Sequence, residues 1–432
     1  MKFIVNSVEF ERALRPVINI ATKNTKKEFK YEFIFTLESF NDKITCVSYG
    51  GKASITSTIS NDNFASLNYS CEKEGNVTID AEKMFLSLKS IPNVDVEIEV
   101  SSGQLNISTL SGKKYVRSIA VYDEPVVAPN VATKFSKEIE INREIFINGM
   151  NSILFAPAFE EKMLNYMCML FESFHGDEDI VRFSAGSGGR FAVKEIMGKN
   201  IIKNKQDVRM ILPKDNLANI VKVLTDANCE KIKVKYAEAD SSESIPEQIV
   251  FNFGETSCDE INMCIFGIDR FSKYPDLNKI IDYQYPNRIF SDLKDWDYAI
   301  SGIDMTLKNY KENIHNTKVV LKTDKNIFMV NPLTKDVAES PVDIVDDEKC
   351  IISGDDEDIW FTCNSIYLKE MVVHAGKMGK IQLNFESQSI LENIPDDQPQ
   401  QMKPILVKFD EKIDDAKSIT ENFYMFFTVS TK

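Results

Sequence analysis

A unit of strand, hairpin, strand and helix recurs along this chain and narrows the folds that it can adopt. The unit is clearest in residues 164–224, where the apolar segments 164–171 and 180–184 flank a polar turn at 175–179, a pattern typical of a β-hairpin. Beyond Pro213, the i, i+3, i+4, i+7 spacing of an amphipathic helix is kept by Leu217, Ile220, Val221 and Leu224. A comparable unit recurs at a period of roughly 140 residues, which indicates an internal repeat of whole domains.

Three copies of this unit, each with two helices against antiparallel sheet, predict an α+β architecture. The expected domains are 1–127, 136–284 and 287–432. A chain of 432 residues, with 43% hydrophobic and 27% charged residues, suits a soluble globular protein of several domains. No long apolar segment resembles a signal peptide or a membrane span, so we expect a cytoplasmic protein.

The helices at the two ends of the chain illustrate the expected packing. In the first repeat, the predicted helix 7–21 has an apolar face formed by Phe10, Leu14, Val17 and Ala21. Its opposite face carries Arg12, Arg15 and Asn19. In the third repeat we expect 296–301 to be extended, followed by a short helix at 304–314 and a second helix at 365–375.

Catalytic and metal-binding functions find little support in the sequence. The eight cysteines are scattered without a Cys-x-x-Cys pair, and there are only three histidines, so reduced, buried thiols are expected and no cofactor or metal. Residues 185–189 match a relaxed nucleophile-elbow pattern around Ser187, but the elbow requires a following helix and Ser187 precedes a predicted strand. The same glycines lack the Gly-Lys-Ser/Thr of a phosphate-binding loop. We therefore expect a non-enzymatic protein.

The net charge of −15 would ordinarily argue against nucleic-acid binding. The acidic residues, however, cluster late in the chain, in predicted turns such as 346–348 and 355–358. A protein can be acidic outside and basic along one lining, so the positions of Lys and Arg matter more than their total.

Several motifs, taken in order, resemble the beta sliding clamp, the processivity subunit of bacterial DNA polymerase III. The chain opens with Met1-Lys2-Phe3, which is similar to the family's Met-Lys-Phe strand. Its Leu14-Arg15-Pro16 is similar to the Leu-Lys-Pro step in the family's first helix. The segments 166–172, 187–192 and 211–215 are similar to its central strand, turn and helix entry. Asp269-Arg270-Phe271 and Pro275-Asp276 are similar to its Gly-Arg-Phe-Pro-Asp-Tyr segment, with residues 272–274 inserted.

This resemblance implies a head-to-tail homodimer of three-domain chains, each forming half of a ring around duplex DNA. It implies as partners the polymerase III catalytic subunit, the clamp loader complex and other proteins with clamp-binding motifs. Residues on or beside the predicted helices would face DNA: Arg12, Arg15, Lys23, Lys26, Lys27, Lys83, Lys89, Arg143, Lys214, Lys222, Lys308, Lys311, Lys369 and Lys377. Taken singly, each lysine is better explained as an ordinary solvated residue, and it is their recurrence on predicted helices, against acid concentrated in turns, that favours the DNA-facing role.

The resemblance also implies a cleft between the second and third domains that captures short apolar peptides, often containing Gln and Leu-Phe. By position, its wall would comprise Tyr166, Arg190, Phe191, Pro275, Ile280, Met425 and Phe427. Core packing is the alternative reading for each of them. The turn departs from the family in carrying Ser187 and Gly189 where Asp and His are usual, and the C-terminal residues 427–432 also differ.

Two hypotheses remain. The first is a DNA-encircling clamp that tethers the polymerase, and the second is a clamp-like interaction scaffold that is not loaded on DNA. Ring closure further requires free sheet edges, and the strand 115–121 is the candidate edge in the first domain.

Overall fold

A computed structural model describes residues 1–21, 34–50, 53–62, 66–157, 166–187, 189–204, 206–227, 229–239, 247–253, 260–266, 274–307, 316–321, 326–330, 337–341, 359–375, 379–386, 404–412 and 418–427. By internal contacts the chain divides into two compact units. The first comprises Met1–Leu154, Cys168–Val181 and Asn200–Ser272. The second comprises Phe155–Met167, Arg182–Lys199 and Lys273–Lys432.

The first unit is built on a 14-stranded antiparallel sheet with the order β14-β10-β16-β17-β18-β4-β3-β2-β6-β9-β8-β7-β1-β5. The strands of its N-terminal part are β1 (Lys2–Asn6), β2 (Ile34–Ser39), β3 (Lys43–Gly50), β4 (Ala53–Ser60), β5 (Ser70–Lys73), β6 (Gly75–Asp80), β7 (Asp95–Ser101), β8 (Gln104–Thr109) and β9 (Val116–Tyr122). The remaining strands are β10 (Lys137–Asn142), β14 (Ile202–Lys203), β16 (Lys231–Ala237), β17 (Gln248–Phe253) and β18 (Glu260–Phe266). The pair β11 (Cys168–Phe174) and β15 (Val208–Pro213) also belongs to this unit, and β12 (Asp179–Gly186) begins in it.

One ladder joins the first and second sequence repeats into this single sheet. Strand β18 pairs antiparallel with β4, in a register that runs from Glu260 opposite Thr58 to Ile265 opposite Ala53. Buried and half-buried residues alternate along most of β4, so one face of the strand packs into the core, and this fixes the register of the ladder.

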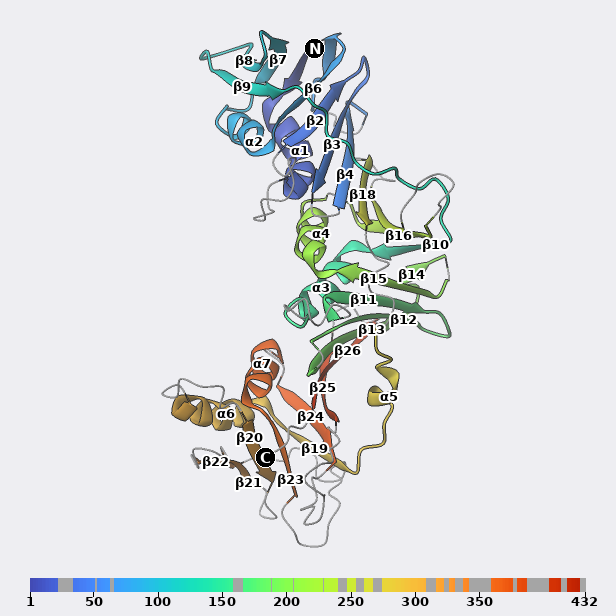
Figure 1. Ribbon diagram of the computed structural model, residues 1–432, viewed down its shortest axis with the longest axis vertical. Coiled ribbons are helices and arrows are strands. Elements are labelled where there is room, and N and C mark those ends of the chain that lie inside the picture. The colour runs from blue at the N-terminus through green and yellow to red at the C-terminus, as the bar shows by residue number, and fades with distance from the viewer. Residues whose placement is uncertain are drawn as a thin grey trace. The chain divides into compact units, whose positions relative to one another are not determined.

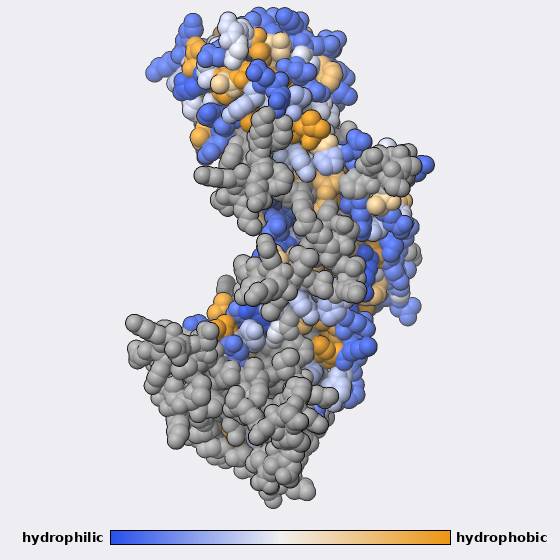
Figure 2. Space-filling model, viewed as in Figure 1, coloured by the Kyte–Doolittle hydropathy of each residue, from blue (hydrophilic) through white to orange (hydrophobic). Residues whose placement is uncertain are grey.

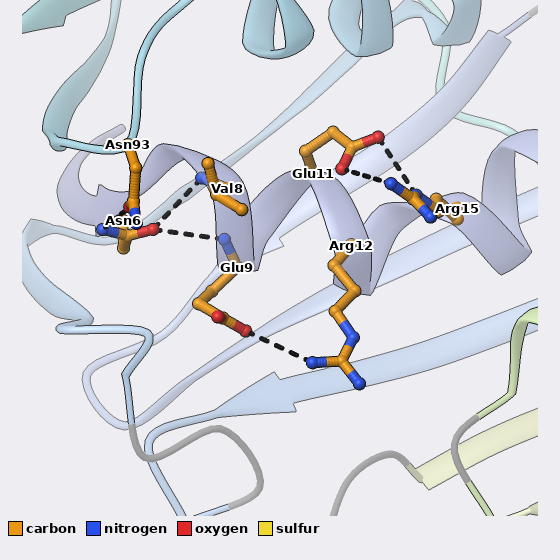
Figure 3. Close-up of polar contacts among 7 residues, drawn as sticks. All are labelled: Asn6, Val8, Glu9, Glu11, Arg12, Arg15 and Asn93. Atoms are coloured by element: carbon orange, nitrogen blue, oxygen red, sulfur yellow. Dashed lines mark hydrogen bonds and ion pairs between the residues drawn. The ribbon is translucent and has the colours of Figure 1, made fainter.

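Helix α1 (Ser7–Ala21) confirms the predicted bounds and most of the predicted face. Phe10, Leu14 and Val17 are fully buried, and each such side chain contributes roughly 1.5–3 kcal/mol through its burial. Asn6 caps the helix, because its Oδ1 accepts the backbone N–H groups of Val8 (3.1 Å) and Glu9 (3.2 Å), as Figure 3 shows.

The prediction that Asn19 projects from the outer face of α1 is wrong. Asn19 is buried, and its Nδ2 donates a 2.7 Å hydrogen bond to Oδ2 of Asp226. Asp226 ends helix α4 (Lys214–Asp226), which packs on α1. Asn19 follows Arg12 and Arg15 on the predicted outer face, and the sequence carries no signal for a partner 207 residues away.

The other helices of this unit are α2 (Ala81–Lys89) and α3 (Arg143–Ile153). Each begins at an extended cap residue whose side chain accepts backbone N–H groups, namely Asp80 for α2 and Asn142 for α3. Figure 1 shows α1, α2, α3 and α4 along the same side of the strands of this unit.

The second unit contains two antiparallel sheet segments. In one, the order is β13 (Arg190–Gly198), β26 (Ser418–Phe427), β25 (Pro404–Lys412), β24 (Lys380–Phe385) and β19 (Asn287–Asp292). In the other, it is β22 (Val337–Pro341), β21 (Asn326–Val330), β20 (Asn316–Leu321) and β23 (Ile359–Asn364). The helices are α5 (Asn278–Ile281), α6 (Leu293–Leu307) and α7 (Ser365–Ala375), and α6 packs on α7.

The prediction of an extended segment at 296–301 is wrong, because these residues lie inside α6. Leu293, Trp296 and Ile300 are buried at the helical spacing i, i+3, i+7, and Trp296 Nε1 donates a 2.7 Å hydrogen bond to Ser291 Oγ. The helix predicted at 304–314 therefore begins earlier, and residues 308–314 lie outside the described part of the chain.

The thiols predict a pH dependence of stability. Cys46, Cys168, Cys264 and Cys363 are buried and form no disulfide, and burial raises the pKa of Cys168 and of Cys264 to about 12. Because the pKa is raised in the folded state, the contribution of the buried thiol to the free energy of unfolding is fully present below the unfolded-state pKa of 9.0. This contribution is lost as pH rises toward the folded-state pKa. We expect the free energy of unfolding by urea to fall between about pH 8.5 and pH 10, and to fall less in Cys168→Ala. An unchanged slope in that variant would contradict the assignment to the thiol.

Candidate nucleic-acid and peptide interfaces

Those predicted DNA-facing residues of the first unit that the structure describes lie on helices α1, α2, α3 and α4. Arg12, Lys83, Lys89 and Lys222 are exposed. The visible described surface at the N-terminal end of the molecule is largely hydrophilic, with scattered hydrophobic residues (Figure 2). The outer faces of α1 and α2 combine these cations with exposed apolar side chains, Val8 and Leu86.

The cations of α1 have carboxylate partners on the same helix. Arg15 donates two hydrogen bonds to Glu11, Nε to Oε1 at 3.1 Å and Nη2 to Oε2 at 3.0 Å, and these bonds raise the pKa of Arg15. Arg12 Nη1 lies 3.9 Å from Glu9 Oε2, a looser pair (Figure 3). Arg15 is thus held against a buried carboxylate, whereas Arg12 is more available to an external anion.

The cations on α2 and α4 also differ in how closely they are paired with other side chains. Lys83 Nζ lies 3.8 Å from the α2 cap residue Asp80, and Lys89 Nζ lies 5.9 Å from the Phe85 ring centroid. Among the described residues, Lys222 has no hydrogen-bond or ion-pair partner. Lys222 and Arg12 are therefore the clearest candidates for phosphate contacts.

Arg143 and Lys214 are less exposed than the resemblance implies. Arg143 is half-buried, and its Nη1 donates to the backbone oxygen of Ala227, just after α4. This contact ties the start of α3 to the end of α4. Lys214 is also half-buried, and burial lowers its pKa. In the second unit Lys369 is exposed on α7, while Lys23, Lys26, Lys27, Lys308, Lys311 and Lys377 lie outside the described residues.

Three aromatic side chains meet at the start of β13. The Phe191 ring lies 5.8 Å from that of Tyr166 and 6.4 Å from that of Tyr274, both in edge-to-face geometry. Phe191 and Tyr274 are buried and Tyr166 is half-buried. The sequence analysis did not predict Tyr274, because this residue falls in the apparent insertion 272–274. The available signal was its position directly before Pro275, which was predicted to line the cleft.

Two glycines make room for this arrangement. A Cβ at Gly186 would lie 2.2 Å from Phe191 Cδ1, and a Cβ at Gly189 would lie 2.7 Å from Tyr367 Oη. Ser187 follows β12, its backbone N–H donates to Arg190 O at 3.0 Å, and β13 begins at Arg190. Ser187 therefore lies in a strand-to-strand turn, as the sequence predicted, and not in a nucleophile elbow.

Arg190 is bound by groups from two other segments. Its Nη1 pairs with Glu370 of α7, its Nη2 donates to Phe155 O at 3.4 Å, and its Cζ lies 5.6 Å from the Tyr367 ring centroid. Neither Glu370 nor Tyr367 was predicted. A pair separated by 180 residues leaves no local pattern in the sequence.

The remaining predicted wall residues lie just before α5, on α5 and on β26. Pro275 and Ile280 are half-buried, and the Ile280 backbone oxygen accepts a 3.1 Å hydrogen bond from Tyr285 Oη. Arg182 holds α5 through a 2.5 Å hydrogen bond to Asn278 Oδ1 and also pairs with Glu195. Met425 stands opposite Phe191 in the β13–β26 ladder, and Phe427 stands opposite Pro404.

The described residues offer neither a metal site nor a membrane-spanning helix. Among them, no three His, Cys, Asp or Glu side chains group as metal ligands. In that same part of the chain, every helix is too short or too polar to cross a membrane.

The α+β architecture with these ladders is the sliding-clamp fold, as comparison with solved structures shows over the full length of the chain. The fold expected from the sequence is therefore confirmed. The similar structures include the DNA polymerase III β chain of Streptococcus pneumoniae, with 17% identity, a TM-score of 0.73 and 99% of each chain covered. They also include the DNA polymerase sliding clamp of Caulobacter crescentus (17%, 0.71, 100% of each chain) and the DNA polymerase III β subunit of Thermotoga maritima (14%, 0.70, 99% of each chain).

Comparison of sequences finds no relative of this chain, in contrast to the comparison of structures. No protein-family model matches the chain, and no curated protein matches it. Another C. crescentus clamp structure is described as carrying polyethylene glycol at a proposed β-motif tethering region. At sequence identities of 14–17%, the likeness to these structures establishes the fold of this chain.

Proposed function

We propose that this protein is a DNA sliding clamp, a non-catalytic processivity factor that encircles duplex DNA and tethers a replicative polymerase. The observation that carries the proposal is the likeness to polymerase III β subunits over 99–100% of both chains. The proposed partners are duplex DNA, the polymerase III catalytic subunit, a clamp loader complex, other proteins with clamp-binding motifs and a second copy of this chain. The proposed repeats remain 1–127, 136–284 and 287–432.

Interactions with DNA would be few and independent of sequence. The exposed cations Arg12, Lys89 and Lys222 project from helices, and long side chains that reach phosphates hold the duplex without reading its bases. Weak interactions of this kind permit sliding.

Charge reversal of Arg12 and Lys222 tests the DNA-facing role of these helices. We expect Arg12→Glu with Lys222→Glu to weaken duplex binding and to reduce the log K against log salt slope by about 0.9 for each phosphate that the variant no longer neutralises. Fluorescence anisotropy of a labelled duplex at several salt concentrations measures both quantities. Lys73→Glu, on the sheet strand β5, is the matched control and should leave both unchanged.

Arg15→Glu is less informative, because reversal there sets a second carboxylate against buried Glu11 and costs stability. Duplex binding that is insensitive to the Arg12 and Lys222 reversals would count against these helices as the DNA-facing surface.

A second candidate function is an interaction scaffold that is not loaded on DNA. It is favoured by the carboxylate partners of Arg12, Arg15 and Lys83 and by the net charge of −15. A chain that captures peptides but shows no salt-dependent duplex binding would support this candidate over the clamp.

Ring closure would use the edge of the first repeat. Strand β9 pairs with β8 along Val116–Ala120, but pairs with β6 only through Val121 and Tyr122. Val116 and Tyr122 are 48% and 45% exposed, so this strand offers both free backbone groups and apolar side chains. A head-to-tail contact with the third repeat of a second copy, repeated by a twofold axis, closes a ring.

Partner capture would use the cluster of Tyr166, Phe191 and Tyr274 with Arg190 beside it. Apolar rings with few polar anchors suit a short apolar peptide. Binding of a fluorescent peptide containing Gln and Leu-Phe, compared with its scrambled sequence, tests this role directly.

A further inference from the structure

The charged part of the proposed peptide site is a pair, not a lone arginine. Arg190 is the first residue of β13, and its guanidinium pairs with Glu370 while it lies over the Tyr367 ring. Burial of an unpaired guanidinium would be costly, so Glu370 stabilises Arg190 in this position. The pair contributes no net charge to the site.

The two partners differ in how accessible they are. The Glu370 side chain is 26% exposed and that of Arg190 is 11% exposed. The preceding turn ends in Gly189, which has no side chain to cover the pair. A molecule that approaches from this side therefore meets the carboxylate before the guanidinium.

We propose that Glu370 is a specificity-determining residue of the peptide site, which selects neutral or basic partner peptides and rejects those with an acidic side chain facing Arg190. The inference rests on the proposed peptide-capture function. An acidic peptide must either lie against the Glu370 carboxylate or displace it from Arg190, and like charges set together in a partly desolvated interface are unfavourable. A neutral peptide leaves the Arg190–Glu370 pair intact.

A glutamate scan of the peptide tests this. The probe is a fluorescent peptide containing Gln and Leu-Phe, with Glu or Gln placed in turn at each of the other positions, and the full chain is titrated by anisotropy. At one or more positions we expect Glu to bind about tenfold more weakly than Gln. Glu370→Gln should reduce that difference to about twofold or less. Asp297→Asn, which removes an exposed carboxylate from α6, is the matched control and should leave the difference unchanged.

Two further arms keep the test decisive if Glu370→Gln does not fold. Arg190→Gln removes the cation that competes for the carboxylate, so the difference should persist or widen. In the wild-type protein, the difference should shrink as salt is raised from about 0.1 M to 1 M, because the Debye length falls from about 10 Å to 3 Å.

The possible failures are distinct. Equal binding of Glu and Gln peptides by the wild-type protein, or an undiminished difference in folded Glu370→Gln, would overturn the role of Glu370 and leave peptide capture standing. Binding of no peptide above its scrambled control would overturn peptide capture itself, and the inference with it.

Discussion

Replacing Val116 and Tyr122 with glutamate is expected to prevent formation of the proposed head-to-tail dimer. Both side chains lie on the exposed face of β9, the strand whose outer edge is largely unpaired among the described residues. Two carboxylates at a pairing edge must be desolvated for the second copy to bind, and we expect the dissociation constant of the dimer to rise at least about a hundredfold. Sedimentation velocity over a range of concentrations measures the change.

The control for this experiment is Val127→Glu. Val127 is 73% exposed but lies beyond the end of β9, so the same change of chemistry there should leave the mass of the dimer unaltered. Negative-stain images should show rings for the wild-type protein and for this control, but not for the double variant. A double variant that remains dimeric would rule out β9 as the closing edge, and a monomeric wild-type protein would rule out spontaneous ring closure.

The second large effect is expected from Gly186→Ala. A Cβ at this position would lie 2.2 Å and 2.5 Å from two atoms of the Phe191 ring and 2.7 Å from the Arg190 backbone oxygen. The ring must shift from its observed position beside Tyr166 and Tyr274, and overpacking of this kind typically costs about 1–3 kcal/mol of stability. We expect peptide affinity to fall at least about tenfold, since Phe191 would lose its place in the aromatic cluster.

Gly176→Ala provides the comparison for this variant. Its added Cβ would meet only Glu178 O at 3.6 Å, an ordinary contact, so both the melting temperature and peptide affinity should match those of the wild-type protein. If Gly186→Ala lowers the melting temperature but binds peptide normally, Phe191 serves the core and not the peptide site.

The comparison of sequence and structure shows which signals are local. Helices α1 and α7 were predicted with their observed bounds, because each repeats an apolar face over several turns. The segment 296–301 was mistaken for a strand because a short apolar run fits both periods, and only the burial of Leu293 and Ile300 on either side of Trp296 resolves it. Local pattern was therefore enough for the longer elements.

The candidate sites could be predicted only in part. The resemblance placed Arg190 and Phe191 together, but the groups that define their surroundings, Tyr274 and Glu370, come from distant segments and were missed. Likewise, the charge of Arg15 was visible in the sequence but its two hydrogen bonds to Glu11 were not. The sequence shows which residue types are present. Whether such a side chain can contact a ligand depends on the neighbours that the tertiary structure places beside it.

The ladder between β4 and β18 has a consequence for how the chain is made. Strand β4 ends at Ser60, whereas its neighbour in the sheet begins only at Glu260. At a synthesis rate of about 5–20 residues per second, the ribosome needs roughly 10–40 s to produce the intervening segment. During that interval the nascent first repeat has an unsatisfied β-strand edge, which is open to pairing with a neighbouring nascent chain.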